Sequence, residues 1–264
     1  MAKTIFTAEQ NQFMRDNYMS MSYADIANEL GFTERQIRGR INNMGLSKTR
    51  KFNKRYFNSI NTAEKAYWLG FIYADGYIIC NSTLANYEFG IELKSTDDYL
   101  LKQLSENLGG VHNLEYKHSH KQFNGYEYET DSCRLRVYSK DICNDLINDG
   151  IMPNKTLQSI YPQCNDFFQD FVRGFLDGDG CIYVDKKNHI GVSFTNSNKD
   201  FLEYLNTQIE ENLSIIGSVY KENDKKYKLM YYRQNDVKYL LDWIYRNNRI
   251  CLNRKYDIYT SYYN

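Results

Sequence analysis

The chain has 264 residues, of which 42% are hydrophobic and 25% are charged, and its formal net charge at pH 7 is zero. This composition is typical of a globular protein with room for two or three domains. No apolar run is long enough for a transmembrane helix, and the N-terminal residues do not resemble a signal peptide. Six cysteines without a CxxC pair and only four histidines favour neither a disulfide framework nor a zinc site. We therefore expect reduced thiols in a cytoplasmic protein.

Residues 1–46 are predicted to form three short helices. Thr7, Ser22 and Thr33 can each begin one of them, and Gly31 can end the second. Two helices joined by a tight turn resemble a helix-turn-helix DNA-binding unit, whose second helix enters the major groove. The side chains expected to face DNA are Arg35, Arg38, Arg40 and Asn42. Arginine suits guanine and asparagine suits adenine. A small helical bundle that contacts other proteins is the alternative.

A basic stretch follows this unit. Between Arg35 and Ala63 the sequence has eight basic residues and no acidic one, although the whole chain is neutral. Those beyond the third helix are Lys48, Arg50, Lys51, Lys54 and Arg55. Local charge matters more to a polyanion than the whole-chain sum, because charges act over roughly 8–10 Å at physiological salt. We predict that residues 47–61 are a basic linker, which lies along DNA phosphates or acts as a flexible tether.

The remainder of the sequence repeats itself. TAEKAYWLGFIYADGYII in one half corresponds to NDFFQDFVRGFLDGDGCIYV in the other. Each half reads as helix, two strands, helix, two strands, helix, which predicts halves at residues 62–152 and 166–264. The connection between them, residues 153–165, contains the only two prolines of the chain. The alternation in YEFGIELK predicts a sheet with one buried and one open face.

Each half also contains one helix that ends in a small residue, an aspartate and a glycine. Gly70 and Ala74 lie four positions apart, as do Gly174 and Gly178, so each helix has a smooth patch on one face. Two such patches allow a close helix crossing. The glycines that follow, at positions 76 and 180, are expected to end the helices with positive φ.

Asp75 and Asp179 would then be the last residues of two touching helices, at the negative ends of both helix dipoles. Two carboxylates in this arrangement repel each other unless a cation lies between them, and hard oxygen ligands favour Mg²⁺. The pattern predicts a divalent-metal site at the crossing. Two aspartates that only terminate helices are the structural alternative.

The two stretches WLGFIYADG and VRGFLDGDG resemble two copies of the LAGLIDADG motif of homing endonucleases. The resemblance covers residues 62 to about 260. It implies an α+β fold in which two pseudo-symmetric αββαββα halves form a saddle over double-stranded DNA, after a small all-α helix-turn-helix domain. It also implies a monomer in which Asp75 and Asp179 bind Mg²⁺, or another divalent cation, and drive cleavage of both strands at a long target site. No backbone ligand is assigned. Tyr73 replaces the first acid of the motif and Asp177 keeps it, but only the second acid is the metal ligand.

In this family a basic residue near the site polarises the ordered water. Alignment of the two halves gives Lys140 for the first half and either Arg233 or Gln234 for the second. Lys155 and Lys255 follow the last helix of each half and could approach phosphates, or be ordinary surface cations. The outward strand positions predicted to contact a DNA groove are Arg134, Arg136, Lys228 and Tyr232.

The resemblance leaves three functions open: an active homing endonuclease, a transcription regulator that no longer cleaves, and an RNA-splicing maturase. The presence of both aspartates favours the first. An intein host is disfavoured, because the chain begins with Met and its last residues lack the His-Asn and following nucleophile of protein splicing. Richness in Asn, Lys, Ile and Tyr is typical of an A+T-rich genome such as that of a phage, which would fit a gene for intron homing.

Overall fold

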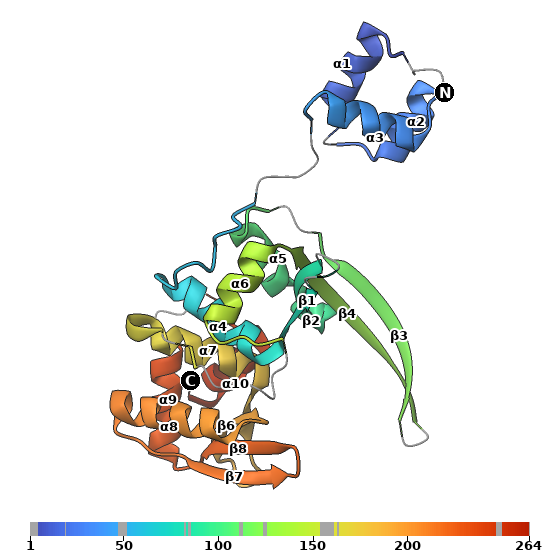
Figure 1. Ribbon diagram of the computed structural model, residues 1–264. Coiled ribbons are helices and arrows are strands. Elements are labelled where there is room, and N and C mark those ends of the chain that lie inside the picture. The colour runs from blue at the N-terminus through green and yellow to red at the C-terminus, as the bar shows by residue number, and fades with distance from the viewer. Residues whose placement is uncertain are drawn as a thin grey trace. The chain divides into compact units, whose positions relative to one another are not determined.

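The computed structural model describes residues 5–18, 20–46, 52–81, 83, 86–110, 113–123, 126–153, 161–162, 164–246 and 250–263. The chain forms two compact units, Met1–Phe52 and Asn53–Asn264. Figure 1 shows the first unit at the blue end of the colour scale, and the second from light blue to red. Buried side chains form a core within each unit, so each is described by itself.

In the first unit the described residues form three helices: α1 (Ala8–Asn17), α2 (Tyr23–Leu30) and α3 (Glu34–Asn43). Each begins as predicted, because the side chain before it accepts a hydrogen bond from the N–H of the third helical residue in a capping box. Gly31 ends α2 in the left-handed conformation, with φ of 71°. The core side chains are Met14, Ile26, Ala27, Ile37 and Ile41. The helix, tight turn and helix predicted at residues 23–43 are therefore present.

The boundary between the units differs from the predicted basic linker. Tyr56 and Phe57 are buried, and the Phe57 ring packs edge-on against Phe89 of the second unit. The N–H of Asn53 also donates to the Leu108 carbonyl at 2.9 Å. Residues 53–61 are thus part of the second unit, because two aromatic side chains anchor them there. Residues 47–51 lie outside the described part of the chain.

The second unit repeats one order of elements twice. The first half contains α4 (Ala63–Asp75), β1 (Gly76–Asn81), β2 (Asn86–Lys94), η1 (Ser95–Asp97), α5 (Asp98–Asn107), β3 (Glu115–Phe123), β4 (Tyr126–Tyr138) and α6 (Lys140–Asn148). The second half contains η3 (Asn165–Phe167), α7 (Phe168–Asp179), β5 (Gly180–Val184), β6 (Ile190–Asn196), α8 (Lys199–Leu213), β7 (Ser218–Asn223), β8 (Lys226–Tyr231), α9 (Gln234–Ile244) and α10 (Asn253–Tyr263). This is the predicted α+β architecture of two matching halves.

Each half has one four-stranded antiparallel sheet. The strand orders are β1-β2-β4-β3 and β5-β6-β8-β7, so the same topology occurs twice. One face of each sheet packs on helices of its own half, as the alternation predicted: Phe89 and Ile91 are fully buried in β2, and Val192 and Phe194 in β6. The two sheets differ in length, since β3 and β4 have 9 and 13 residues whereas β7 and β8 have 6 each. Figure 1 shows β3 and β4 as a long two-stranded ribbon.

The helices α4 and α7 cross at the centre of the second unit (Figure 1). A Cβ atom on Gly70 would lie 2.1 Å from the Phe171 carbonyl oxygen, and one on Gly174 would lie 2.0 Å from the Tyr67 carbonyl oxygen. No real side chain tolerates such contacts, so the two backbones touch because both positions are glycine. One turn further on, a Cβ on Gly178 would lie 2.3 Å from the Ala74 Cβ. The structure therefore places all four small residues of the repeated motif at the crossing.

The glycines that follow the two helices have a different role from the one predicted. Gly76 has φ of −74° and Gly180 has φ of −98°, so neither is in the left-handed region. Each is limited by space instead. A Cβ on Gly76 would lie 2.5 Å from the Ile72 side chain, and one on Gly180 would lie 2.5 Å from the Leu176 side chain. At these two points the chain passes directly from a helix into a strand. The strand begins so close to the last turn of the helix that only glycine fits.

Candidate active site at the helix crossing

The two acidic residues of the repeated motif end the two crossing helices, α4 and α7. Asp75 is the last residue of α4 and Asp179 is the last residue of α7. The Oδ2 atom of Asp75 lies 3.2 Å from the position that a Cβ on Gly178 would occupy, so the Asp75 carboxylate is placed against the final turn of α7. Asp75 is exposed and Asp179 is partly exposed. The crossing thus brings two carboxylates to the C-terminal ends of two helices, where the helix dipoles add negative potential.

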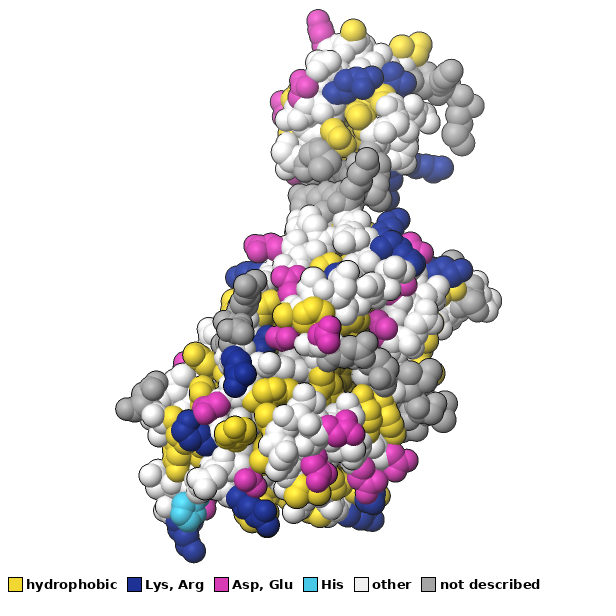
Figure 2. Space-filling model, turned by 90° about the vertical axis from the view of Figure 1, so that its left-hand side faces the viewer, with side chains coloured by type: hydrophobic (Ala, Val, Ile, Leu, Met, Phe, Trp, Pro, Cys, Tyr) yellow, Lys and Arg dark blue, Asp and Glu magenta, His cyan; other side chains and the backbone are white. Residues whose placement is uncertain are grey.

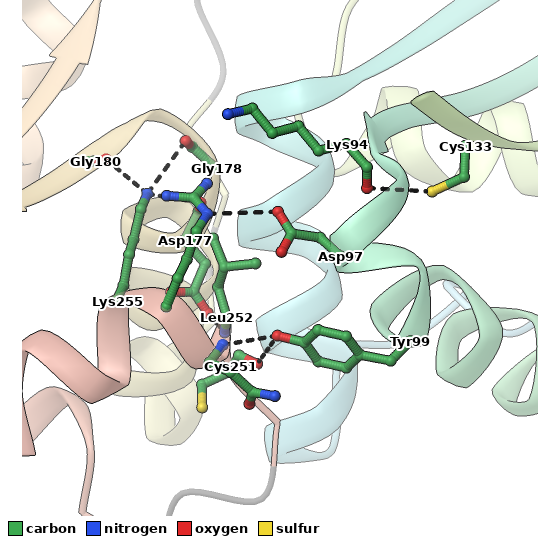
Figure 3. Close-up of polar contacts among 12 residues, drawn as sticks. Lys94, Asp97, Tyr99, Cys133, Asp177, Gly178, Gly180, Cys251, Leu252 and Lys255 are labelled. Carbon is green, nitrogen blue, oxygen red and sulfur yellow. Dashed lines mark hydrogen bonds and ion pairs between the residues drawn. The ribbon is translucent and has the colours of Figure 1, made fainter. Parts of the chain in front are cut away.

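Lys255 supplies a buried positive charge at this negative end. Its ammonium donates to the carbonyl oxygens of Leu176 and Gly180 at 2.6 Å each and to that of Asp177 at 2.7 Å. Figure 3 shows the contact with Gly180 and a longer one, of 3.5 Å, with the Gly178 carbonyl oxygen. Only 4% of the residue is exposed. Burial lowers the pKa of the Lys255 ammonium to about 8, while the carboxylates of Asp177 and Asp75 act in the opposite direction. Lys255 was predicted to contact DNA phosphates, and that assignment is corrected: its three donors are used to cap α7.

Asp177 joins the two halves at the same place. Its Oδ2 atom accepts a hydrogen bond from the Tyr67 hydroxyl at 2.9 Å and another from the Leu252 N–H at 2.7 Å. Burial raises the pKa of Asp177 to about 6, and Lys255 and the two hydrogen bonds act to lower it. The corresponding residue of α4 is Tyr73, whose ring packs on Phe201 in the second half with 4.4 Å between ring centroids. The replaced acid of the first motif is therefore an apolar contact across the crossing.

The start of α10 and the residues that lead into it also contact the first half. The Tyr99 hydroxyl donates to the Cys251 carbonyl at 3.2 Å and accepts from the Asn253 N–H at 2.7 Å. Arg254 donates to the buried Asp97 carboxylate at 3.4 Å. Figure 3 shows these contacts next to the Lys255 cap. Residues 251–255 thus hold the end of α7 against η1 and α5, so the geometry at the two acids depends on both halves.

The basic residues predicted to assist water lie at the other end of the sheets. In the first sheet Gly76, next to Asp75, pairs with Ile91, whereas Tyr138, two residues before Lys140, pairs with Glu88. Glu88 is three residues from Ile91 along β2, which at about 3.3 Å per residue separates Lys140 from Asp75 by roughly 10 Å or more.

The second half shows the same displacement. Gln234 exchanges hydrogen bonds with the backbone of Ile190, which pairs with Val184 at the end of β5 remote from Gly180. Arg233 precedes Gln234, and its side chain lies 4.0 Å from the Asp236 carboxylate. The assignments of Lys140, Arg233 and Gln234 as residues beside the acids are therefore corrected by the strand register.

Two other basic residues lie at the correct end, and sequence reasoning missed them. Lys94 is the last residue of β2, three positions beyond Ile91 and therefore on the side of the sheet where α4 ends. Its exposed side chain extends toward the end of α7 in Figure 3. Arg254 is 57% exposed and is held by Asp97. Counting the register from the β1–β2 hairpin would have indicated Lys94, and Arg254 directly precedes the predicted Lys255.

The predicted groove-contacting residues lie on the open faces of the two sheets, where most of them are paired with acids. Arg134 forms an ion pair with Glu92 and Arg136 with Glu115, while Lys228 lies 2.5 Å from Glu222. A phosphate would have to compete with these carboxylates. Tyr232 is 57% exposed. The sequence analysis did not single out three further exposed tyrosines on the same face of β4 as the arginines: Tyr126, Tyr128 and Tyr138.

In the first unit the predicted DNA-facing residues of α3 divide into two groups. Arg35 and Asn42 are exposed. Arg38 is bound to Glu34 at 2.5 Å, and the Arg40 Nε donates to the Asn11 side chain at 2.7 Å. Of the remaining predicted contacts, Lys54 is exposed and Arg55 lies 3.2 Å from the Asp145 carboxylate, both in the second unit. Lys48, Arg50, Lys51 and Lys155 lie outside the described residues.

The residues at the crossing fit a magnesium ion that is completed by substrate. Among the described residues no group of three or more His, Cys, Asp and Glu side chains could hold a metal ion. Mg²⁺ does not require such a group, since proteins usually bind it through one or two carboxylates together with water and phosphate oxygens. Asp75 and Asp179 provide two carboxylates, and the last turns of two helices provide carbonyl oxygens. The available ligands are thus hard oxygen atoms. They do not fill the coordination sphere of Mg²⁺, which leaves positions for water and for a phosphate oxygen.

Charge on the outer surface is mixed. On the face shown in Figure 2, basic and acidic side chains are interspersed among apolar ones, which agrees with a net charge of zero. Within the described part of the chain, no helix combines the length and apolar character that crossing a membrane requires. A polyanion that approaches the face shown in Figure 2 would meet local groups of basic residues and not a uniformly basic surface.

Two helices that cross through glycines, end in acids and lie between two sheets of equal topology define the LAGLIDADG type of fold. Residues 167–250 match the family model described as a LAGLIDADG-like domain. The predicted resemblance to this family is therefore confirmed, and the match falls on the second half of the repeat.

Comparison with solved structures gives the same fold. The homing endonuclease I-WcaI bound to its DNA recognition sequence is 14% identical, with a TM-score of 0.55, and the match covers 81% of this chain and 95% of that chain. The meganuclease I-SmaMI bound to uncleaveable DNA is 13% identical, with a TM-score of 0.51 and coverage of 75% and 86% respectively. At this level of identity the comparison shows the fold alone. No curated protein matches the chain.

Proposed function

We propose that the protein is a site-specific DNA endonuclease of the homing type, which acts as a monomer and makes Mg²⁺-dependent double-strand breaks at a long target site. The observation that carries the proposal is that Asp75 and Asp179 end two helices packed backbone to backbone, with the Asp75 carboxylate against the last turn of α7. Solved structures of the same fold are described as bound to DNA, I-WcaI to its recognition sequence among them. Lys255 supplies one cation at this shared helix end, and a divalent ion would further offset the repulsion between the two carboxylates.

In this proposal Asp75 and Asp179 hold the ion, and the carbonyl oxygens of the last helical turns are available beside them. When bound, Mg²⁺ supplies a charge that lowers the pKa of water and stabilises the attacking and leaving oxygens of the phosphodiester. Lys255 fixes the end of α7 and with it the position of Asp179. Lys94 and Arg254 are exposed cations at this end of the molecule, where they can attract the phosphate.

The remaining contacts would position the DNA. The open faces of the two sheets carry the arginines, lysine and tyrosines described above, which can reach base edges and phosphates in the grooves. The first unit is proposed to act as a helix-turn-helix module that adds contacts at one flank of the site. Two units that bind adjacent stretches of one duplex would lengthen the recognised sequence and raise the affinity of the full chain.

The proposal is tested by replacing each acid with its amide. The full chain is incubated with a library of random duplexes in Mg²⁺ and the cut ends are sequenced, so that the cleaved duplexes themselves reveal the target. Asp75→Asn and Asp179→Asn should abolish double-strand cleavage of that target and leave binding similar or slightly tighter, because a repulsive charge is removed. Glu211→Gln, which changes an exposed acid on α8, is the matched control and should cut like the wild type.

Two outcomes would contradict the proposal. Full cutting by either aspartate variant would exclude the paired acids as the active site. Binding of a defined duplex by the wild type, with no cutting in Mg²⁺ or Mn²⁺, would indicate a DNA-binding regulator on the same fold.

A further inference from the structure

Gly39 lies in the middle of α3, and nothing in the described part of the protein explains it. The other glycines in the described part of the chain either have positive φ or would place a Cβ within 3 Å of a neighbouring atom. Gly39 has neither property: its φ is not in the left-handed region, and a Cβ there would meet no atom within 4 Å. Glycine in a helix interior destabilises the helix relative to alanine. A helix-interior glycine without an internal reason suggests that something outside the chain approaches the helix there.

The residues around Gly39 form one exposed face. Arg35 lies four positions before it and Asn42 three positions after it, so the three share a side of α3. At 1.5 Å per residue this face is about 10 Å long. Ile37 and Ile41 are buried on the opposite side of the helix. The face therefore has a donor-bearing side chain at each end and bare backbone in the middle.

Two neighbouring arginines are turned to other contacts. Arg38 is paired with Glu34, the one acid of α3, and its guanidinium lies 5.5 Å from the centre of the Tyr23 ring. Arg40 donates to Asn11 and lies 5.8 Å from the centre of the Phe6 ring on the other flank. These contacts direct both side chains toward α1 and α2, which leaves the middle of the exposed face clear.

We propose that α3 docks into the DNA major groove through the face made by Arg35, Gly39 and Asn42, with Gly39 at the point of closest approach to the base edges. This inference rests on the proposed DNA-binding function of the first unit. Arg35 and Asn42 are the specificity-determining residues, since arginine pairs with guanine and asparagine with adenine in that groove. Arg38 and Arg40 brace the helix against α1 and α2 and flank the groove.

The chemistry of the face favours DNA over a protein partner. A protein-binding helix usually presents an apolar stripe, whereas this face consists of one cation, one amide and backbone. The major groove is about 12 Å wide, which is close to the diameter of a helix with its side chains. Removal of one side chain from the middle of such a helix allows it to enter more deeply. The basic residues that follow in sequence, from Lys48 to Lys51, add positive charge beyond the end of α3.

The decisive variant is Gly39→Ala in the full chain, because it separates folding from docking. The added methyl group has open space in the free protein, so hydrogen exchange of the α3 amides should slow. The same methyl group should hold the helix away from the groove. Binding is measured in Ca²⁺ on duplexes selected by the wild type from a random-sequence library. We expect Gly39→Ala to bind those duplexes about tenfold more weakly, which is the effect of losing one good base contact.

Three further variants test the side chains. Arg35→Ala and Arg15→Ala each remove one exposed arginine from the first unit, but only Arg35 lies on the proposed face. Repeating the library selection with each variant should show that Arg35→Ala and Asn42→Ala lose base preference at defined positions of one flank. Arg15→Ala should retain the wild-type preference.

The inference is overturned if Gly39→Ala slows exchange in α3 and binds as tightly as the wild type. It is equally overturned if Arg35→Ala selects the same bases as Arg15→Ala, which would point to phosphate contacts alone or to a protein partner. Cleavage in Mg²⁺ is measured on the same duplexes. A wild type that selects a flank but does not cut would count against the endonuclease activity and not against the docking face.

Discussion

Lys255 shows how a single buried cation can organise a helix end. The last carbonyl groups of a helix have few N–H groups left to bind within the helix. The Lys255 ammonium donates to the carbonyl oxygens of Leu176 and Asp177 in the last turn of α7, and to that of Gly180 just beyond it. The charge lies where the helix dipole is negative, so the cap and the dipole stabilise the same arrangement. Asp179 belongs to this turn, and its orientation depends on the turn being complete.

Replacement of Lys255 by methionine should therefore cost much more than removal of a surface lysine. The variant takes a donor away from buried carbonyl oxygens, and we expect the free energy of unfolding to fall by about 2–4 kcal/mol. Lys238→Met, which removes an exposed lysine from α9 and its ion pair with Asp242, should change it by less than about 1 kcal/mol. Urea unfolding of both variants measures the two values. Equal losses would show that Lys255 has no special role at the helix end.

Asp177 gives a prediction about pH. Its pKa in the folded protein is about 6, above the ordinary value of 3.8. The folded state therefore holds a proton more tightly than the unfolded state, so the stability contributed by this group is fully present below pH 4 and is lost as pH rises through 6. Asp177→Asn removes the titration and keeps an oxygen that can accept from Tyr67 and Leu252.

The stability of the wild type relative to Asp177→Asn should thus increase as pH falls from 7 to 4. Urea midpoints of the two proteins at several pH values in this window measure the difference, and titrating groups that do not interact with Asp177 cancel. A difference that does not vary with pH would contradict the raised pKa.

At the residue scale, the sequence predicts features that follow from the repeated motif. It does not predict features that follow from the pairing of strand residues. The positions of Asp75 and Asp179 at the ends of two crossing helices follow from the repeated order of a small residue, an aspartate and a glycine. The positions of Lys140 and Lys94 follow from which strand residues pair, and the order of residues along the chain does not indicate which end of a sheet they occupy. The burial of Lys255 depends on α10 packing against α7, a contact between segments far apart in sequence.

At the scale of elements, the crossing of α4 and α7 is the most constrained feature. Gly174→Ala should destabilise the second unit by about 3 kcal/mol or more, because the added Cβ would lie 2.0 Å from the Tyr67 carbonyl oxygen and the helices cannot separate without opening the core. Gly39→Ala is the matched control, since the same change there meets no atom. Thermal unfolding should show a lower melting temperature for Gly174→Ala only. Equal melting temperatures would mean that the two backbones are not in contact.

The ends of α4 and α7 show a feature of the elements that a sequence pattern cannot predict, namely the backbone conformation of the glycine after each helix. A glycine directly after a helix favours a left-handed cap, which is the commonest reason for glycine in that position. At Gly76 and Gly180 the chain instead enters a strand at once, and the neighbouring Ile72 and Leu176 side chains occupy the space of a Cβ. Both readings require glycine, so the sequence alone could not distinguish them.

At the scale of the whole molecule, the two units predict separable contributions to DNA binding. A fragment of residues 53–264 keeps the buried Tyr56 and Phe57, which a fragment that begins at residue 58 would lose. It should fold and cut, but bind DNA more weakly than the full chain. Each lost phosphate contact should reduce the slope of log affinity against log salt by about 0.9, so three contacts made by residues 1–52 would reduce it by about three.

Binding of the full chain and the fragment to the selected duplex across a salt series measures both slopes. The same measurement on Glu211→Gln of the full chain controls for charge changes away from DNA. Identical slopes and footprints would show that residues 1–52 do not touch DNA, and the helix bundle would then be assigned to protein contacts.

The contact between Tyr67 and Asp177 also has a consequence for the ancestry of the molecule. By the internal repeat, the counterpart of Tyr67 is Phe171, which has no hydroxyl. If two copies of the second half assembled with each other, each buried Asp177 would face a phenyl ring in place of its donor. The hydrogen bond therefore ties the second half to the first, and a symmetric pair of second halves would lose it twice. Duplication followed by such divergence leaves each half free to change its own surface without a matching change in the other.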